Sequence, residues 1–220
     1  MTGDLTVALE GFHAVKHALR FAPGLVQTII VTDRTSAAEL ADRLAPDVKA
    51  LLLSRATVGP VAHPTGVTGV ADRPARDDRP LATRRSPLVL LDDPRHPGNV
   101  GAVVRVAAAA GASGVVVSGT LDPWHPAVLR GSAGLHFALP VLSVHPDDVT
   151  GPLFVLDAEG ELLGEIPDNA VLVVGSERAG VGPLLRSRAD AVVALPMRAG
   201  VSSLNLATAV SAVLYRWRLA

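Results

Sequence analysis

Short apolar runs separated by polar, turn-rich segments dominate the chain from residue 88 onward. A strand buried on one face alternates apolar and polar positions, whereas a strand buried on both faces is apolar almost throughout. The runs here are of the second kind, and they predict a parallel sheet covered on both faces in an α/β fold. The predicted strands span residues 88–91, 114–119, 153–157, 170–175 and 190–196.

Two helices are predicted in this part of the chain. The first spans residues 99–110 and is rich in alanine and valine, and Gly111 can end it. The second spans residues 203–218, and Ser202 or Ser203 lies near its start as a candidate cap.

The first part of the chain has the pattern of a smaller α/β unit. Helical periodicity predicts helices at 11–20 and 36–45, the second with Ser36 as its cap. Apolar runs predict strands at 26–32, 48–54 and 66–71.

A polar stretch rich in arginine and proline separates the two parts. Residues 72–87 lack apolar periodicity, which is typical of a linker. We therefore expect three segments, namely a small α/β domain at 1–75, a linker at 76–87 and the larger domain at 88–220.

The composition excludes several classes of protein. The chain has 220 residues, of which 49% are hydrophobic, so it can bury one large core or two modest ones. Its formal net charge of −1 argues against bulk electrostatic binding, so any nucleic-acid contact must come from a local patch. It has no cysteine, which excludes disulfides and thiolate chemistry. Because no leader-like or membrane-spanning apolar run is present, we expect a soluble cytoplasmic protein.

Arg105 stands in the middle of the otherwise apolar helix "NVGAVVRVAAAA". No acidic residue lies three or four positions away, so the helix itself offers no ion pair. Its stem could simply pack while its head reaches water. Alternatively, a helix that is apolar on nearly all sides is buried, and a buried charge needs a partner or a task. The apolar surroundings favour the second interpretation.

Two further loops follow predicted strands, where ligands of doubly wound sheets bind. "GSERAGVG" begins at Gly175 and contains Glu177 and Gly180, and its glycines allow close approach to a ligand. "PMRAGVSSLN" leads from Pro196 into the last helix at Asn205. Each also has an ordinary explanation, since the first can be a plain glycine-rich turn and the second a serine-capped helix start.

Several common sites are not supported. The sequence contains no G-x-G-x-x-G or Walker A loop and no G-x-S-x-G elbow. His13 and His17 have the spacing of metal ligands on a helix, but a third ligand is not evident, so we expect no metal.

Taken in order, these loops resemble the three signature motifs of the SpoU/TrmH family of RNA ribose methyltransferases, in the SPOUT superfamily. The matching residues are Asn99, Gly101, Arg105 and Ala107, then Gly175, Glu177 and Gly180, then Pro196, Met197, Ser203, Leu204 and Asn205. The stretch 122–134 also resembles the family's D-P-x-x-P-x-x-x-R-x-S-A-G block, which includes Arg130. One departure is Ala199, where many members have glycine; Gly200 follows it, and we expect only a small change in the loop.

The resemblance implies a fold, a cofactor and an assembly. The fold is a SPOUT-type parallel sheet with a C-terminal trefoil knot, preceded by a small RNA-binding domain. The cofactor is S-adenosylmethionine, and the two later loops would hold it. The cofactor contacts carried over are Gly175, Ser176, Leu195, Pro196, Met197 and Leu204. The family works as a homodimer with its active sites at the interface, and the last helix is the expected interface.

The resemblance also implies a reaction, methylation of a ribose 2′-hydroxyl in RNA. Arg105 is either the group that removes the hydroxyl proton or the group that positions the hydroxyl and its neighbouring phosphate, because a guanidinium is normally always protonated. The other residues expected at the catalytic site are Asn99, Glu177, Ser203 and Asn205. The expected RNA contacts are Arg84, Arg85, Arg95 and Arg130, although the charges of the linker also suit a solvated tether.

Three alternatives to this reading follow from the same residues. The chain could be an RNA-binding or assembly protein that kept the fold without catalysis, an unrelated nucleotide-binding oxidoreductase, or an enzyme that methylates a base. The set of motif residues favours a ribose methyltransferase over all three. The sequence does not distinguish transfer RNA from ribosomal RNA as the substrate. It also neither supports nor excludes a role in antibiotic resistance.

Overall fold

A computed structural model describes residues 5–176 and 179–220 of the chain. The chain divides into two compact units. Unit 1 comprises Met1–Ala75 and Ala133–Ala138, and unit 2 comprises Arg76–Ser132 and Leu139–Ala220. Among the described residues, no helix has both the length and the apolar character that crossing a membrane requires.

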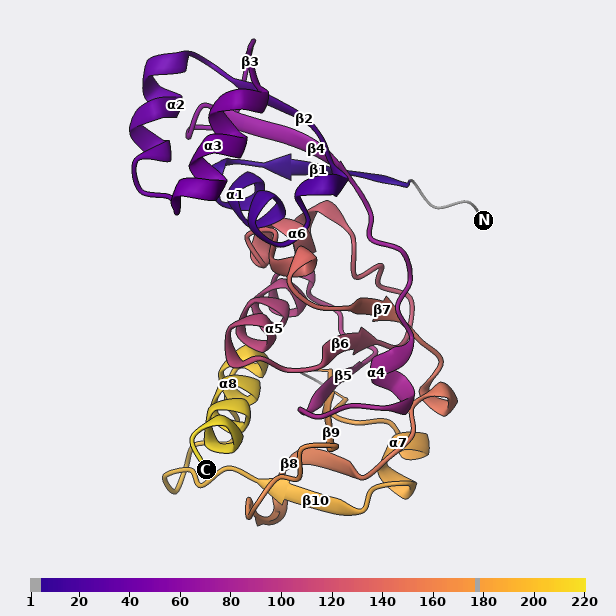
Figure 1. The fold of residues 1–220 in the computed structure, drawn as a ribbon. Helices are drawn as coiled ribbons and strands as arrows, with labels where there is room; N and C mark the ends of the chain where they lie inside the picture. Colours follow the sequence, from indigo (N-terminus) through magenta and orange to yellow (C-terminus); the bar gives the residue numbers. More distant parts are fainter. Residues whose placement is uncertain (1–4, 177–178) are drawn as a thin grey trace. The chain divides into compact units, whose positions relative to one another are not determined.

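Unit 1 is a four-stranded sheet covered by helices (Figure 1). The strand order is β1-β4-β2-β3; β4 is antiparallel to both neighbours, and β2 and β3 are parallel. Leu9, Leu19, Ile29 and Leu52 form the most deeply buried part of its core. The elements are β1 (Thr6–Glu10), α1 (Phe12–Phe21), η1 (Pro23–Leu25), β2 (Val26–Val31), α2 (Arg34–Ala41), α3 (Pro46–Arg55), β3 (Ala56–Val58), β4 (Val67–Asp72) and η2 (Leu135–Phe137).

Two sequence predictions in unit 1 are wrong. The run 48–54, predicted as a strand, belongs to helix α3, where the buried residues Val48 and Leu52 are one helical turn apart. The cap of α2 is Asp33, whose carboxylate accepts the Ser36 N–H at 2.8 Å, so Ser36 lies in the first turn. This hydrogen bond lowers the pKa of Asp33.

Unit 2 is a six-stranded sheet in the order β10-β8-β9-β5-β6-β7, with every strand pair parallel. The predicted α/β fold with a parallel sheet is therefore confirmed. The elements are α4 (Arg79–Ala82), β5 (Leu88–Asp92), α5 (Pro97–Ala110), β6 (Gly114–Val117), α6 (Pro126–Gly131), β7 (Val141–Ser143), η3 (Pro146–Asp148), β8 (Leu153–Leu162), β9 (Val171–Gly175), α7 (Pro183–Ser187), β10 (Ala191–Ala194) and α8 (Leu206–Arg218).

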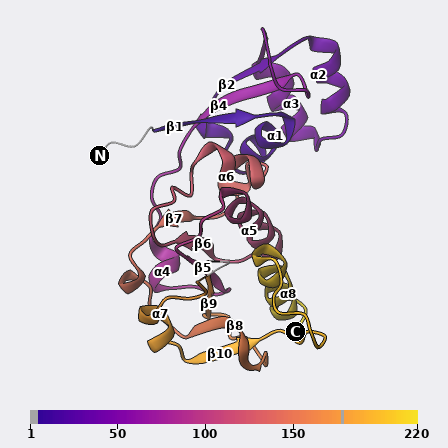
Figure 2. The ribbon, with the colours of Figure 1, turned by 180° about the vertical axis from the view of Figure 1, so that it is seen from behind.

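Helices cover both faces of this sheet. Figures 1 and 2 show α5 and α8 on one side and α4 and α7 on the other. Leu81 of α4 and Leu185 of α7 pack with Leu88 and Leu90 of β5 in one buried cluster. Because side chains alternate along a strand, the buried residues between them, such as Val89, face α5 and α8. Burial on both faces explains why the strands are apolar throughout.

The stretch 76–87, expected as a linker, is packed into unit 2. It forms α4, and Leu81 is buried in the core. The Arg84 guanidinium donates to the backbone carbonyls of Pro80 and Leu81, both at 3.1 Å, to that of Asn169 at 2.8 Å, and to that of Thr150. Burial lowers the pKa of Arg84, but an arginine stays protonated at neutral pH.

One end of α5 and one end of α8 were predicted from the sequence. α5 ends at Gly111, whose φ of 77° is the left-handed conformation that the sequence predicted there. α8 begins at Leu206 and is capped by Asn205, whose side chain accepts the N–H groups of Ala207 and Thr208. The prediction of a serine cap at Ser202 or Ser203 is therefore wrong.

Candidate functional site

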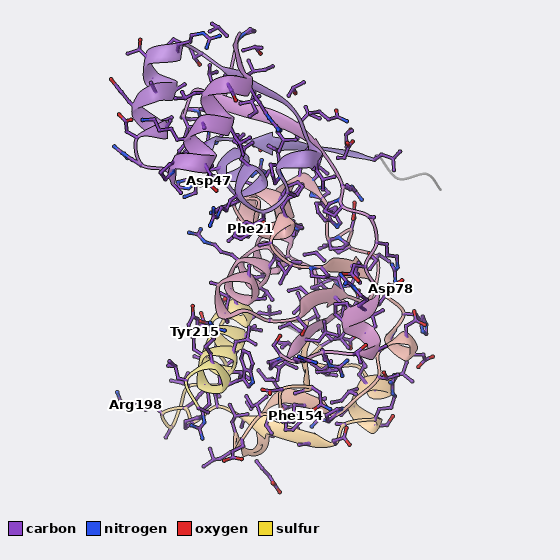
Figure 3. The ribbon with its side chains drawn as sticks, viewed as in Figure 1. Phe21, Asp47, Asp78, Phe154, Arg198 and Tyr215 are labelled. Atoms are coloured by element: carbon purple, nitrogen blue, oxygen red, sulfur yellow. The ribbon has the colours of Figure 1, made fainter. Side chains whose placement is uncertain are left out.

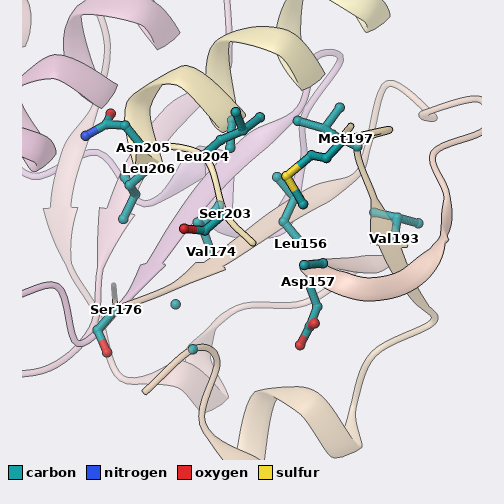
Figure 4. Close-up of a pocket in the computed structure, with 15 residues that line it drawn as sticks. Leu156, Asp157, Val174, Ser176, Val193, Met197, Ser203, Leu204, Asn205 and Leu206 are labelled. Carbon is teal, nitrogen blue, oxygen red and sulfur yellow. The ribbon is translucent and has the colours of Figure 1, made fainter. Parts of the chain in front are cut away.

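A pocket of about 390 Å³ lies beside the middle of β8 and at the ends of β9 and β10, and the start of α8 closes it (Figure 4). Five of the six expected cofactor contacts line it, and Pro196 does not. Two expected catalytic residues, Ser203 and Asn205, line it as well. The lining residues are Leu156, Asp157, Ala158, Val174, Gly175, Ser176, Gly180, Val193, Leu195, Met197, Ser203, Leu204, Asn205, Leu206 and Ala209.

The loop after β9 folds back closely on the end of its strand. The Gly180 N–H donates to the Ser176 carbonyl at 2.9 Å. A Cβ atom on Gly175 would lie only 1.9 Å from the carbonyl carbon of Gly180 and 2.2 Å from the backbone nitrogen of Val181. Real Cβ atoms do not come this close to backbone, so the turn requires glycine at position 175.

Asp92 fixes the far end of this loop to the sheet. Its carboxylate accepts the Gly182 N–H at 2.7 Å and the Ser118 hydroxyl at 2.8 Å. Asp92 is the last residue of β5, and Ser118 follows β6. The Asp92 side chain thus joins the carboxyl ends of β5 and β6 to the start of α7, a role that the sequence analysis did not identify.

The loop after β10 contains a tight turn over residues 198–201. The Val201 N–H donates to the Arg198 carbonyl at 3.0 Å, and Gly200 has a φ of 88°. A positive φ at the third position of such a turn favours glycine. The glycine that this turn needs is therefore Gly200, which leaves Ala199 at a position that any residue can occupy.

Asn205 joins the first and third loops. Its Nδ2 atom donates to Oδ1 of Asn99 at 3.3 Å, although the two residues are 106 positions apart. The same side chain caps α8 through its Oδ1 atom, which accepts the Ala207 N–H at 3.0 Å. Asn205 therefore holds the start of α5 beside the start of α8 at the mouth of the pocket.

Arg105 differs from expectation in one respect. The apolar sequence of α5 favoured a buried arginine, but Arg105 is exposed. Arg105 does not line the pocket described above. Within residues 5–176 and 179–220 its side chain makes no hydrogen bond or ion pair. The buried positions of α5, among them Val100, Val103 and Val104, face the protein, and Arg105 lies on the opposite side.

Gly101, another residue of the first motif, allows two helices to pack closely. A Cβ atom there would lie 2.4 Å from the Val128 carbonyl oxygen and 2.8 Å from the Cα atom of Gly131 in α6. Gly101 is buried at this contact. The close approach of α5 and α6 explains the glycine without a ligand.

Asp157 is a lining residue that the sequence analysis missed. It lies on β8, accepts the Glu159 N–H at 3.0 Å, and forms an ion pair with Arg186. The backbone hydrogen bond from Glu159 and the contact with Arg186 lower the pKa of Asp157, so the pocket carries a carboxylate at neutral pH. Its position at the end of the run "LFVLD" was the only available signal.

The remaining expected residues are dispersed. Glu177 lies outside the described residues. Arg95 is exposed and pairs with Asp93 at 2.5 Å, and Arg85 and Arg130 are exposed. The hydrogen bonds of Arg84 give that residue a structural role. Of the residues that the structure describes, no three His, Cys, Asp or Glu side chains are grouped closely enough to hold a metal ion.

Comparison with known proteins gives consistent results. A model of the SpoU rRNA Methylase family matches residues 86–215. The chain is 33% identical over 232 residues to the 23S rRNA (guanosine(2553)-2′-O)-methyltransferase RlmP of Bacillus subtilis, which covers 97% of this chain and 88% of that protein. It is 34% identical to the 23S rRNA (uridine(2479)-2′-O)-methyltransferase of Streptomyces viridochromogenes, over 69% of this chain and 59% of that protein.

The fold is also similar to a solved structure. The SpoU methyltransferase AviRb from Streptomyces viridochromogenes, in complex with the cofactor AdoMet, superposes with a TM-score of 0.79 and 27% sequence identity. The match covers 98% of this chain and 90% of that chain.

Proposed function

The chain belongs to the SpoU rRNA Methylase family, and from this premise we propose that it methylates a ribose 2′-hydroxyl of RNA with S-adenosylmethionine as the methyl donor. The observation that carries the proposal is the pocket into which the loops after β9 and β10 bring five of the expected cofactor contacts. The hydrogen bond from Asn205 to Asn99 adds the first motif to the same place.

The residues present fit S-adenosylmethionine. The volume of about 390 Å³ lies within the range of small-molecule sites, about 300–1,000 Å³. Leu195, Met197 and Leu204 offer apolar surface for an adenosine group, and Ser176 and Asp157 offer polar atoms for the charged end. When bound, the cofactor supplies a methyl group that its sulfonium already makes electrophilic.

The chain's own task is then to align the ribose hydroxyl and help it lose a proton. We assign Arg105 to hold the hydroxyl and the adjacent phosphate, since its guanidinium is exposed, protonated and uncommitted among the described residues. Asn99, Ser203 and Asn205 shape the mouth of the pocket beside the ribose. We also propose a catalytic role for Glu177, which rests on its match to the second motif.

RNA contacts are proposed outside the pocket as well. The exposed residues Arg85, Arg95 and Arg130 suit phosphate oxygens, and unit 1 is proposed as the small RNA-binding domain. Arg84 is excluded from this set because backbone carbonyls engage its guanidinium.

We further propose a homodimer that completes the active site. Arg105 lies outside the pocket of its own chain. Tyr215 of α8 is 41% accessible, and Leu219, directly after the helix, is 83% accessible. A second copy on this face would cover the apolar residues and could present its Arg105 to the pocket. Sedimentation at twice the mass of one chain supports this arrangement, and a monomer that methylates RNA contradicts it.

The trefoil knot is proposed for the C-terminal region of unit 2. β10 is the edge strand of the sheet, yet α8 returns to pack on α5, which follows the central strand β5. A C-terminal segment that passes through a loop of the chain would return to the sheet in this way. A crystal structure in which the C-terminal segment does not pass through a loop of the backbone would contradict the knot.

The function is tested with labelled S-adenosylmethionine and two pools of unmodified RNA, 23S rRNA and transfer RNA. After digestion to nucleosides, mass spectrometry should find the label on a ribose 2′-oxygen in one pool. Because both relatives described above are named for 23S rRNA, we expect label in that pool. Cofactor binding without label in either pool would favour the non-catalytic RNA-binding alternative, and label on a base would overturn the ribose assignment.

Asn205→Asp should separate the two roles of Asn205. The carboxylate still accepts the Ala207 N–H and so keeps the cap, but it cannot donate to Asn99. We expect unchanged thermal stability and an affinity for S-adenosylmethionine about three- to tenfold weaker, the worth of one hydrogen bond, measured by calorimetry. Asn205→Ala should also lose about 1 kcal/mol of unfolding free energy because the cap is gone. Equal cofactor affinity in all three proteins would contradict the bridging role.

A further inference from the structure

Unit 1 contains a second pocket, of about 260 Å³, which the methyl-transfer site does not use. It lies between the last two turns of α1, the turn that joins α2 to α3, and the start of α3. Its apolar floor includes Val48, which is buried. The lining residues are Lys16, His17, Arg20, Phe21, Arg43, Leu44, Ala45, Val48 and Leu135.

An exposed aromatic ring stands at this pocket. Phe21, which is labelled in Figure 3, is the last residue of α1. It is 50% accessible, whereas Phe12 and Phe137 are buried at 6% and 7%. The His17 ring lies beside it, with the two ring centroids 6.4 Å apart. A half-exposed phenylalanine offers a ring face to a ligand that can stack.

Positive charge surrounds the ring. Arg20 is paired with Asp47 at 2.7 Å, so these two charges offset each other. The side chains of Lys16 and Arg43 make no hydrogen bond or ion pair within the part of the chain that the structure describes. The pocket therefore has two uncommitted cations next to an apolar floor, in a chain whose overall net charge is −1.

We propose that this pocket binds one unpaired nucleotide of the RNA substrate, with its base against Phe21 and its flanking phosphates on Lys16 and Arg43. The inference rests on the proposed function for the identity of the substrate as RNA. Unpaired bases are recognised by stacking on aromatic rings, and phosphates by Lys and Arg. The volume is below the usual range for small-molecule sites, which suits a single base better than a whole cofactor.

The test measures equilibrium binding of the full chain to in vitro-transcribed 23S rRNA over a series of salt concentrations. Phe21→Ala should weaken binding about tenfold, and Phe21→Trp should stay within about twofold of the unaltered chain because it keeps a ring. The pair Lys16→Gln and Arg43→Gln should reduce the slope of log affinity against log salt by about 1.5, because two phosphate contacts are lost. Arg34→Gln is the matched control, an exposed cation of α2 outside the pocket.

All these side chains are exposed or half-buried, and unchanged affinity for S-adenosylmethionine in each variant serves as the check that it folds. Phe21→Ala binding as tightly as the unaltered chain would overturn the inference, and so would an equal effect of Arg34→Gln. Because binding is measured without methyl transfer, the experiment tests the nucleotide pocket and the proposed enzymatic function independently. A chain that binds through Phe21 and methylates no RNA refutes the enzyme, whereas one that methylates RNA with Phe21 irrelevant refutes only the nucleotide pocket.

Discussion

Arg105→Ala is expected to lower kcat for RNA methylation about a thousandfold while leaving the affinity for S-adenosylmethionine unchanged. The reason is its location. Arg105 is exposed and lies outside the pocket lining, and its side chain makes no hydrogen bond or ion pair among the described residues. Removing it therefore takes nothing from the fold or the cofactor, and only the hydroxyl and its neighbouring phosphate lose their partner.

The measurement is single-turnover methylation of 23S rRNA, with cofactor affinity determined separately by calorimetry. Arg79→Ala is the matched control, since Arg79 is an exposed arginine of α4 whose side chain, among the described residues, pairs with the neighbouring Asp77. It should leave both quantities unchanged. A rate for Arg105→Ala within about tenfold of the unaltered enzyme would contradict the assignment, since loss of a positioned acid–base group typically costs more than that.

Arg105→Lys distinguishes the two roles open to this residue. If Arg105 holds a phosphate and the hydroxyl, lysine keeps the charge but not the forked geometry, so activity recovers in part with an unchanged pH profile. If the side chain removes the proton itself, lysine is the easier group to deprotonate, and the variant's rate should rise steeply with pH.

The sequence predicted the parallel sheet well because its strands are buried on both faces. That burial leaves an apolar signature in each strand, as in "VLVVG" of β9. The sequence-based prediction failed at residues 48–54, where a short apolar run fits a strand or a helix equally well. The deciding facts are Pro46 in the first turn and the burial of Val48 and Leu52, and burial is known only from the fold.

The site was predictable loop by loop but not as an assembly. Spacing indicates that Asn99 and Asn205 each begin a helix, and it says nothing about the 3.3 Å contact between them. Asp157 and Asp92 were missed because neither belongs to a recognisable motif, and the role of each depends on which loops the sheet order brings beside it. The burial expected for Arg105 also failed, because an apolar helix can keep one face for a partner that the single chain does not contain.

Gly175→Ala is expected to weaken S-adenosylmethionine binding about a hundredfold and to lower the free energy of unfolding by about 2 kcal/mol. The added methyl would meet the backbone of Gly180 at 1.9 Å and of Val181 at 2.2 Å. Backbone cannot turn aside as a flexible side chain does, so the backbone of Gly180 and Val181, in the loop after β9, must shift. This loop supplies Ser176 and Gly180 to the pocket and is tied to β5 through Asp92, so the shift either breaks that tie or opens the pocket.

Gly164→Ala provides the control, because a methyl group there meets nothing within 4 Å. It should bind the cofactor normally and unfold at the same denaturant concentration as the unaltered chain. Calorimetry and urea unfolding together show whether Gly175→Ala changes cofactor affinity, stability or both. A stability loss with normal affinity would mean that the loop moves away from the pocket without disturbing it, and normal values of both would refute the close approach on which the site depends. The combination of weak binding with a modest loss of stability is the outcome that the geometry requires.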